Sequence, residues 1–226
     1  MRTSRGEFAV IFDIDGTMVN NTSYHRRAWM ELTKRHGMNL TDRQYRERVH
    51  ARSNEKIVRE LFGSDVSQEV IDRIADKKES LYRRSFAAEL KEIPGLGRLL
   101  EELDREGIGC AAASNSPVEN VDFVLDGLGI RKFFRVIINR DQVSEGKPNP
   151  QILLKAADGL GFEPGRCFVF EDSASGFKAA RTAGMRYAAI TAGTDPAELA
   201  EAFDAAGVFE DFSSITPQLC RSWLGI

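Results

Sequence analysis

Two aspartates, one residue apart, follow an almost unbroken apolar run near the N-terminus. The stretch FAVIFDIDGT spans residues 8–17, and its acidic pair is Asp13 and Asp15. In an extended chain, side chains two residues apart point to the same side, about 6.6 Å from one another. One carboxylate of such a pair can attack phosphorus while the other gives or takes the proton of the oxygen that leaves or arrives. The pair therefore predicts Asp13 as a nucleophile and Asp15 as a general acid and base.

Further polar side chains follow three later apolar runs. Ser114 and Asn115 follow one run, Lys147 comes after another within GKPNP, and Glu171 and Asp172 follow a third. Ligands of open parallel sheets bind at the carboxyl ends of the strands, so we expect these side chains and the acidic pair to converge. Chance placement of loop residues is a poor explanation for so many charged and polar groups at these positions.

The converging groups suit a phosphoryl group bound beside a divalent cation. Carboxylate oxygens form the kind of site that Mg²⁺ prefers, together with water and substrate phosphate. Lys147 supplies a compact positive charge, and Ser114–Ser116 precedes an expected helix start whose N–H groups attract anions. The sequence thus predicts a magnesium-dependent site for phosphoryl transfer.

Five short apolar runs are typical of buried parallel strands. We expect strands at Phe8–Phe12, Ile108–Ala113, Arg135–Ile138, Cys167–Phe170 and Tyr187–Thr191. The last four alternate with helical patterns, which indicates an α/β fold with a parallel sheet. Helix starts are predicted where a capping residue precedes a proline: SPVE with Ser116 as N-cap and Glu119 completing a capping box, NPQI from Asn149, and DPAE from Asp195.

About ninety residues between Phe12 and Ile108 show helical patterning and no convincing strand. Segments 23–37, 53–63 and 68–90 place apolar residues three or four positions apart, as amphipathic helices do. We therefore expect a small all-helical domain at residues 21–89, inserted after the first strand of an α/β core built from residues 1–20 and 90–226.

Composition restricts the class of protein. The chain has 226 residues, 42% of them hydrophobic, and a net charge of −3, which suits a globular protein with no general attraction to nucleic acid or anionic membranes. Its longest apolar runs are far shorter than the roughly 20 residues of a membrane span, and MRTSRGE at the N-terminus lacks the apolar stretch of a secretory signal. Three cysteines without metal-ligand spacing favour a reducing compartment. We expect a cytoplasmic monomer that acts on a small-molecule phosphate ester.

In their order along the chain, these motifs resemble those of the haloacid dehalogenase superfamily of phosphohydrolases. DIDGT matches the first motif, SNS the second, the lysine of GKPNP the third and EDS the fourth. The resemblance implies a Rossmann-like core, Mg²⁺ as cofactor and an aspartyl-phosphate intermediate on Asp13. It also implies a metal site of Asp13, the backbone carbonyl of Asp15, and Asp172, with Glu171 assisting. The implied phosphate-binding residues are Gly16, Thr17, Ser114, Asn115 and Lys147.

Within the superfamily, YHRRAW at residues 24–29 resembles the start of the helical cap in β-phosphoglucomutase and related sugar-phosphate phosphatases. His25 matches a histidine that couples cap closure to the acid/base aspartate in the mutase, and Lys78 matches a cap lysine near the substrate. The mutase also grips the second phosphate of its substrate with an arginine. Here Asn54 takes that place, with Arg52 two positions earlier. Replacing an arginine by an amide should weaken binding of a bisphosphorylated sugar at least tenfold, since a hydrogen bond to a charged group contributes about 1.5–3 kcal/mol.

Three functions compete on this basis. The first is a Mg²⁺-dependent phosphatase of a small phosphorylated metabolite, most simply a sugar phosphate. The second is a hexose phosphomutase of the β-phosphoglucomutase type, which His25 and Lys78 favour and Asn54 disfavours. The third is a non-enzymatic phospho-receiver domain, which the inserted helical domain argues against. Members that remove halide usually lack the second aspartate, so Asp15 argues against dehalogenation.

Overall fold

A computed structural model of the chain describes residues 6–49, 52–192 and 204–226. Its contacts divide the chain into two compact units. One, here called the sheet unit, combines Met1–Asn20 with Lys91–Ile226, and the other, the helical unit, is Asn21–Leu90. These bounds differ by one residue from those expected from the sequence. The helix start predicted at Asp195 lies outside the described residues.

The sheet unit is built on a parallel sheet of six strands in the order β3-β2-β1-β4-β5-β6. The strands are β1 (Ala9–Phe12), β2 (Gly109–Ala113), β3 (Phe134–Ile138), β4 (Cys167–Glu171), β5 (Arg186–Ile190) and β6 (Val208–Phe209). The five predicted strands are all present, each within one residue at either end. The sequence analysis missed β6, because a strand of two residues is too short to show a pattern. The chain winds outward in both directions from β1 and β4, so the topological switch point lies between these neighbours.

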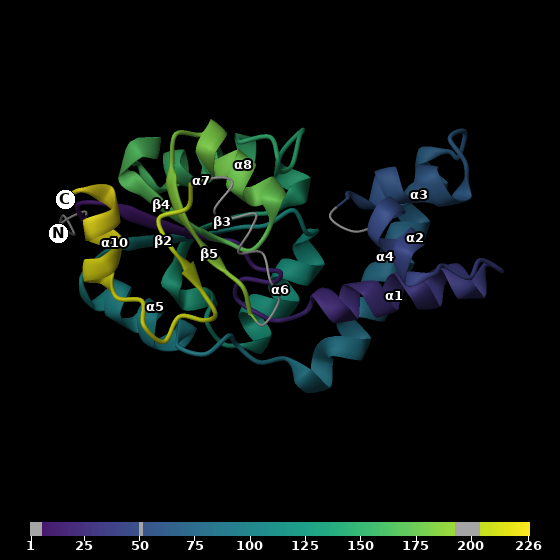
Figure 1. The fold of residues 1–226 in the computed structure, drawn as a ribbon, viewed down its shortest axis with the longest axis horizontal. Helices are drawn as coiled ribbons and strands as arrows, with labels where there is room; N and C mark the ends of the chain where they lie inside the picture. The colour runs from purple at the N-terminus through teal and green to yellow at the C-terminus, as the bar shows by residue number, and fades with distance from the viewer. Residues whose placement is uncertain (1–5, 50–51, 193–203) are drawn as a thin grey trace. The chain divides into compact units, whose positions relative to one another are not determined.

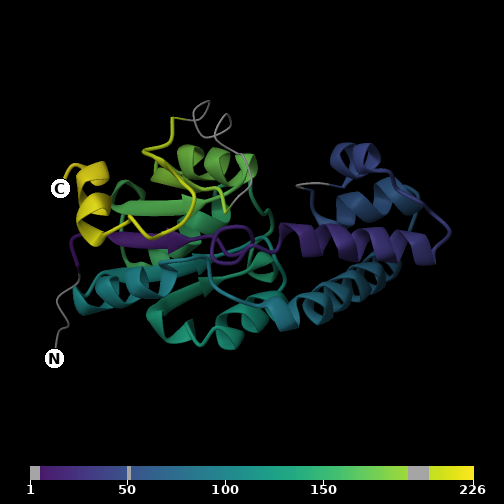
Figure 2. The same ribbon diagram turned by 60° about the horizontal axis from the view of Figure 1, so that its bottom comes forward.

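Helices cover both faces of this sheet. In Figure 1, α7 (Gln151–Leu160) and α8 (Ala174–Thr182) lie above the sheet, whereas α5 (Leu96–Arg105) and α6 (Val118–Gly127) lie below it, and Figure 2 shows the same separation. The last helix, α10 (Pro217–Leu224), stacks Trp223 on Phe168 of β4 with ring centroids 4.8 Å apart. Short 3-10 turns complete the unit: η2 (Arg131–Phe133), η3 (Arg140–Gln142) and η4 (Pro164–Arg166). With both faces covered, β1, β2 and β4 are buried along their whole length, which explains their continuous apolar sequence.

Two predicted helix caps were wrong. Pro117, not Ser116, is the N-cap of α6, and this N-cap residue makes no side-chain capping hydrogen bond. The hydroxyl of Ser116 is bound elsewhere, as described below. Pro150 is likewise the N-cap of α7, although Asn149 still accepts a hydrogen bond from the N–H of Gln151 at 2.9 Å. In both cases the proline precedes the helix instead of occupying its first turn.

The helical unit contains α1 (Thr22–Arg35), α2 (Asp42–Arg48), α3 (Asn54–Phe62), α4 (Gln68–Phe86) and the 3-10 turn η1 (Ala87–Glu89). Three of these helices match the predicted segments. The sequence analysis missed α2, although Thr41 and Gln44 form a capping box at its start. Its sequence DRQYRER contains one apolar residue, Tyr45, which is buried, so the usual periodicity is lacking. None of the helices described has the length and hydrophobicity needed to cross a bilayer.

Candidate active site

Three carboxylates meet where β1 and β4 end. Asp13 follows β1, Glu171 is the last residue of β4, and Asp172 comes next in the chain. Among the described residues, they form the one group of three potential metal ligands whose ligand atoms all lie within 4.8 Å of one another. The N–H of Asp13 donates to the carbonyl of Phe170 at 3.0 Å, which continues the pairing of β1 with β4 and holds the acidic tips side by side.

Lys147 completes this group, which we call the core cluster: Asp13, Lys147, Glu171 and Asp172. Its ammonium group donates to Asp13 Oδ1 at 2.5 Å, to Glu171 Oε1 at 2.5 Å and to the carbonyl of Ala113 at 2.8 Å. These bonds use the three donors of a lysine. Lys147 is 8% exposed and Glu171 1% exposed, so the charges interact in an environment largely closed to water.

Burial sets the protonation of these groups. Burial and the charge of Glu171 raise the pKa of Asp13 well above its usual value, against the lowering effect of Lys147. Burial, Glu171 and Asp13 also raise the pKa of Asp172. Burial alone would lower the pKa of Lys147, but Asp13 and Glu171 together raise it above its usual value. One ammonium group therefore does not compensate three crowded carboxylates, of which Asp13 and Glu171 are buried, and a bound cation would favour their ionised forms.

The start of α8 fixes Glu171. Its Oε2 accepts hydrogen bonds from the N–H of Asp172 at 3.0 Å, the N–H of Ser173 at 3.1 Å and the hydroxyl of Ser173 at 3.0 Å. Ser173 is also the N-cap of α8, so one residue both starts the helix and holds the carboxylate. A Cβ at Gly176 would lie 1.8 Å from Glu171 Cδ, so the carboxylate occupies space that only glycine leaves open.

A tight loop after β1 turns the chain back on itself. Asp15 forms an isolated bridge with Val19, and Met18 donates its N–H to the carbonyl of Ile14 at 2.9 Å. Gly16 has φ of +86°, and a Cβ there would lie 1.9 Å from Asp172 Oδ2. Glycine is thus required both for the left-handed backbone and for close approach to the carboxylates.

Asp15 points to different partners from those of Asp13. Its Oδ2 accepts hydrogen bonds from the hydroxyls of Ser114 at 3.1 Å and Ser116 at 2.6 Å. Both serines follow β2, the other neighbour of β1 in the sheet. The two aspartates of DIDGT therefore have separate surroundings: Asp13 is bound to an ammonium group, and Asp15 to hydroxyls. Such a difference can assign two carboxylates to two chemical roles.

The side chain of Asn115 binds the backbone of Lys147. Its Oδ1 accepts from the Lys147 N–H at 2.8 Å, and its amide donates to the Lys147 carbonyl at 3.1 Å. The structure therefore gives this side chain a role in holding the lysine loop in place. Thr17 is fully buried in the loop after β1, and its hydroxyl has no hydrogen-bond partner in the structure.

The helical unit has its own buried polar group, here called the helical-unit cluster: His25, Asn54, Lys78 and Glu79. Lys78 donates to His25 Nδ1 at 2.7 Å and to Glu79 Oε1 at 2.9 Å, and Asn54 donates to the same Glu79 oxygen at 2.8 Å. Because an ammonium group can only donate, Nδ1 of His25 is the acceptor. The structure thus brings three of the four predicted cap residues together.

Arg52, the fourth, lies apart from this cluster. It is exposed and donates to the carbonyl of Glu47 at 2.9 Å. Two members of the surrounding packing were not identified from the sequence as site residues: Glu79 itself and Tyr82, whose ring stacks on His25 with centroids 3.8 Å apart. Within KKES and SLYR, these residues look like ordinary parts of an amphipathic helix.

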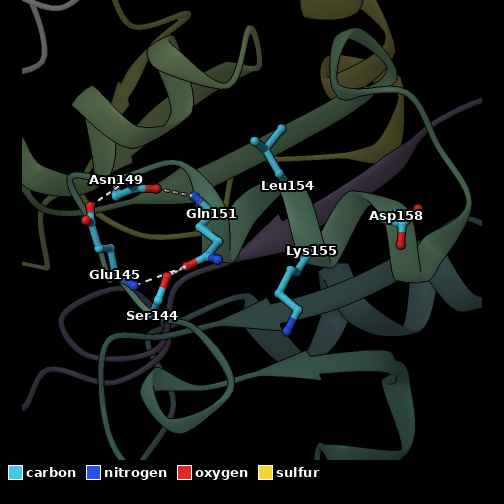
Figure 3. Close-up of a pocket in the computed structure, with 7 residues that line it drawn as sticks. All are labelled: Ser144, Glu145, Asn149, Gln151, Leu154, Lys155 and Asp158. Carbon is cyan, nitrogen blue, oxygen red and sulfur yellow. Dashed lines mark hydrogen bonds between the residues drawn. The ribbon is translucent and has the colours of Figure 1, made fainter.

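A surface hollow of about 460 Å³ lies near the lysine loop without including the core cluster. Figure 3 shows its lining, where Gln151 is bound by Ser144 and the backbone of Glu145, and Asn149 is bound to Glu145. These polar groups are hydrogen-bonded to one another, and the hollow brings together no group of charges comparable to the core cluster. The chemistry of the sheet unit therefore belongs to the strand ends.

A family model of haloacid dehalogenase-like hydrolases matches residues 10–190. The chain belongs to this family. The match includes β1 from Val10 onward, the loop after it and every member of the core cluster. It confirms the resemblance stated from the four sequence motifs, and with the observed sheet it confirms the predicted fold class.

Several members of the family are similar to the chain over most of its length. A phosphorylated carbohydrates phosphatase from Thermotoga maritima is 32% identical over 182 residues, which is 78% of this chain and 82% of that protein. A β-phosphoglucomutase from Bacillus subtilis is 32% identical over 187 residues, covering 78% and 80%. A crystal structure of the CbbY protein from Rhodobacter sphaeroides in complex with xylulose-(1,5)bisphosphate has a TM-score of 0.79 and 29% identity, covering 93% of this chain and 96% of that one.

Sequence reasoning missed two residues of the sheet-unit site. The SPVE pattern predicts Ser116 as a helix cap, and Ser173 stands in the sequence only as the last residue of EDS. Both lie within the quoted motifs SNS and EDS. A serine two or three residues after a strand end can bind backbone or a side chain, and only the three-dimensional structure shows which partner it has.

Proposed function

We propose that this haloacid dehalogenase-like hydrolase is a Mg²⁺-dependent phosphatase of a small phosphorylated metabolite, and that sugar phosphates are its substrate class. The observation that carries the proposal is the convergence of Asp13, Lys147, Glu171 and Asp172 at the ends of β1 and β4. Asp15 lies in the adjoining loop with separate partners. This arrangement offers a nucleophile, a second carboxylate for proton transfer and a positive charge for the phosphate.

The residues present fit a magnesium ion. All three candidate ligand side chains are carboxylates, which is the donor type that Mg²⁺ prefers. Their burial with a single ammonium group leaves negative charge that a divalent cation would compensate. We propose Asp13, Asp172 and the backbone carbonyl of Asp15 as ligands, with Glu171 assisting. When bound, the ion would neutralise phosphate charge and polarise the P–O bond.

Asp13 would act as the nucleophile, with its carboxylate oxygen forming a bond to phosphorus as the bond to the leaving oxygen breaks. Asp15 would donate its proton to that leaving oxygen. In the second half of the reaction, Asp15 would take a proton from water, which attacks phosphorus and releases Asp13. Lys147, Ser114, and the loop residues Gly16, Thr17 and Asn115 would hold and orient the phosphoryl group or the residues that bind it.

Proton transfer alone is too weak to explain catalysis of this reaction. Hydrolysis of a phosphate monoester can require acceleration of up to about 10²¹-fold. General acid–base catalysis contributes about 10²–10⁴-fold. Positioning by a rigid strand end and electrostatic stabilisation of the developing charge must therefore supply most of the rest. The fully buried β1 is suited to that requirement.

The relatives support the substrate class. One is named for phosphorylated carbohydrates, and the CbbY structure contains a sugar bisphosphate. We propose that His25, Asn54, Arg52 and Lys78 contribute to substrate selection. Within the helical-unit cluster, Glu79 compensates the charge of Lys78 at 2.9 Å. That pairing leaves less positive charge for a second phosphate, so we favour monophosphates.

Phosphate release from a panel of sugar and polyol phosphates tests the function. With Mg²⁺, we expect steady turnover that EDTA abolishes, and acid-quenched mass spectrometry should find a phosphate adduct on the peptide that contains Asp13. Asp13→Asn should eliminate both signals. Asp104→Asn is the matched control, because Asp104 is exposed on α5 of the same unit. Absence of turnover for every ester with Mg²⁺ present would refute the proposal.

The mutase remains the second candidate, because Lys78 binds His25 directly. Phosphorus NMR with β-glucose 1-phosphate separates the two functions. A phosphatase releases inorganic phosphate, whereas a mutase produces glucose 6-phosphate without net loss of ester. Isomerisation without phosphate release would reverse our ranking.

A further inference from the structure

The hydroxyl of Ser116 binds an active-site carboxylate and not the helix that follows it. Sequence SPVE is a strong N-cap pattern, yet the N-cap of α6 is Pro117, and neither it nor Ser116 provides the side-chain cap. Asp141 instead accepts the N–H of Val118, the first residue of α6, at 3.0 Å. The Ser116 hydroxyl donates to Asp15 Oδ2 at 2.6 Å, a shorter contact than that from Ser114 at 3.1 Å.

A departure from local preference at this position suggests a function. Serine before a helix normally satisfies a free N–H of the first turn, and the loss of that bond weakens the helix start. Local rules are broken most often where function requires it. From this geometry we infer that Ser116 is a positioning residue for Asp15: it holds this carboxylate in place for proton transfer. The inference rests on the proposed phosphatase function and goes beyond it.

The chemistry of Ser114 makes a second serine necessary. A hydroxyl has one proton to donate. In this structure Ser114 donates it to Asp15, while its oxygen accepts the N–H of Ser116 at 3.0 Å. If Ser114 donates to the substrate phosphate, as we propose, that proton is no longer available to Asp15. Ser116 can keep its bond to Asp15 in both states, so the carboxylate stays anchored while Ser114 changes partner.

Leaving-group dependence tests the inference. The leaving group of 4-nitrophenyl phosphate departs as a stable anion and needs no proton, whereas that of a sugar phosphate must be protonated. Single-turnover release of the leaving group isolates the first half of the reaction. In Ser116→Ala we expect a decrease of about ten- to a hundredfold with the fastest sugar phosphate of the panel, the range for loss of one hydrogen bond to a charged group. With 4-nitrophenyl phosphate we expect less than about a threefold decrease.

Two further variants separate positioning from helix stability. Asp141→Ala removes the acceptor at the start of α6 and leaves the two serine hydroxyls bound to Asp15, so its sugar-phosphate rate should stay within about threefold of wild type. Ser116→Thr keeps the hydroxyl and should restore the rate to within about threefold.

Equal losses with both substrates in Ser116→Ala would overturn the inference, as would a matching loss in Asp141→Ala or failure of Ser116→Thr to restore the rate. An inactive wild-type protein would instead refute the proposed function.

Discussion

Each unit buries a cluster of charged side chains, but the two clusters differ in balance. The core cluster joins three carboxylates to one ammonium group at the ends of β1 and β4. The helical-unit cluster pairs one ammonium group, Lys78, with one carboxylate, Glu79, and adds His25 and Asn54 as hydrogen-bond partners. The lysine of each cluster is buried, with Lys147 8% exposed and Lys78 3% exposed.

The difference in charge balance is the one expected between a site that carries out chemistry and a cluster that stabilises the fold. A buried charge is tolerated when a partner and hydrogen bonds compensate it. The helical-unit cluster meets that condition within itself. The core cluster meets it only partly: burial and the neighbouring carboxylates raise the pKa values of Asp13 and Asp172. A buried site with uncompensated charge is suited to bind a cation together with a phosphate group.

Replacing Asp13, the proposed nucleophile, should produce the largest loss of activity while leaving stability unchanged or higher. In Asp13→Asn we expect phosphatase activity to fall by at least about 10⁴-fold, as when other covalent nucleophiles are removed. The metal-free protein should keep or increase its melting temperature, because one of three crowded carboxylates becomes neutral. Steady-state kinetics and thermal unfolding in EDTA measure the two effects. A large fall in melting temperature would mean that the core cluster mainly stabilises the fold.

Removing the ammonium group of the core cluster should affect both activity and fold. Lys147→Ala leaves Asp13 and Glu171 without their buried cation, so we expect the free energy of unfolding to fall by about 3–5 kcal/mol in EDTA. Added Mg²⁺ should restore part of this loss, since it supplies positive charge in the same cluster. Urea unfolding with and without Mg²⁺ checks this. No response to Mg²⁺ would argue against a cation site formed by these carboxylates.

Removing the charge partner of the buried lysine in the helical unit should affect the free energy of unfolding much more than catalytic turnover. Glu79→Gln removes the counter-charge of buried Lys78, and we expect a loss of about 3 kcal/mol in the free energy of unfolding. Turnover of 4-nitrophenyl phosphate should remain within about threefold, because the core cluster is unchanged. Glu55→Gln is the control, because its partner Arg59 is an exposed i,i+4 neighbour and such a pair contributes under about 0.5 kcal/mol.

The raised pKa values give the response to Mg²⁺ a defined pH dependence. An unfolded Asp titrates near its usual 3.8, whereas Asp13 and Asp172 titrate well above that when folded. Between these values the native state binds more protons than the unfolded state, so the stability contribution of these groups falls as pH rises. Mg²⁺ binds the ionised carboxylates, and its stabilising effect should therefore grow with pH over the same interval. Melting temperatures with Mg²⁺ and with EDTA, measured across pH, test the sign. A shift that shrinks as pH rises would contradict it.

Sequence patterns predicted what depends on neighbours along the chain. Continuous apolar runs located the five strands of more than two residues, and polar residues at the strand ends located Asp13, Glu171 and Asp172, whereas Lys147 lies farther along the loop after β3. Convergence of these residues follows from parallel topology, because the carboxyl ends of the strands lie at one edge. The sequence was informative here because a strand followed by a short loop fixes where a side chain must be.

What the sequence did not predict are partners distant in the chain. Ser116 has two possible acceptors, the start of α6 and Asp15, and local preference favours the wrong one. Glu79 looks like one more charged residue of α4, and only the packing of α3 and α4 shows that Asn54 and Lys78 bury it. Hydrogen bonds between such residues depend on tertiary contacts that a short window of sequence does not contain.

The smallest predicted effect compares one helix cap in each unit. The hydroxyl of Ser173 caps α8 and also binds Glu171, whereas that of Ser53 caps α3 by accepting the N–H of Lys56. Replacing either serine by alanine should lower the free energy of unfolding by about 1 kcal/mol, the usual contribution of an N-cap. Ser173→Ala should in addition weaken apparent Mg²⁺ affinity about three- to tenfold, because Glu171 loses a donor that orients it. Mg²⁺ titration of phosphatase activity measures that difference. Equal Mg²⁺ affinity in the two variants would show that the backbone N–H groups of Asp172 and Ser173 are sufficient to hold Glu171, and that the hydroxyl serves the helix alone.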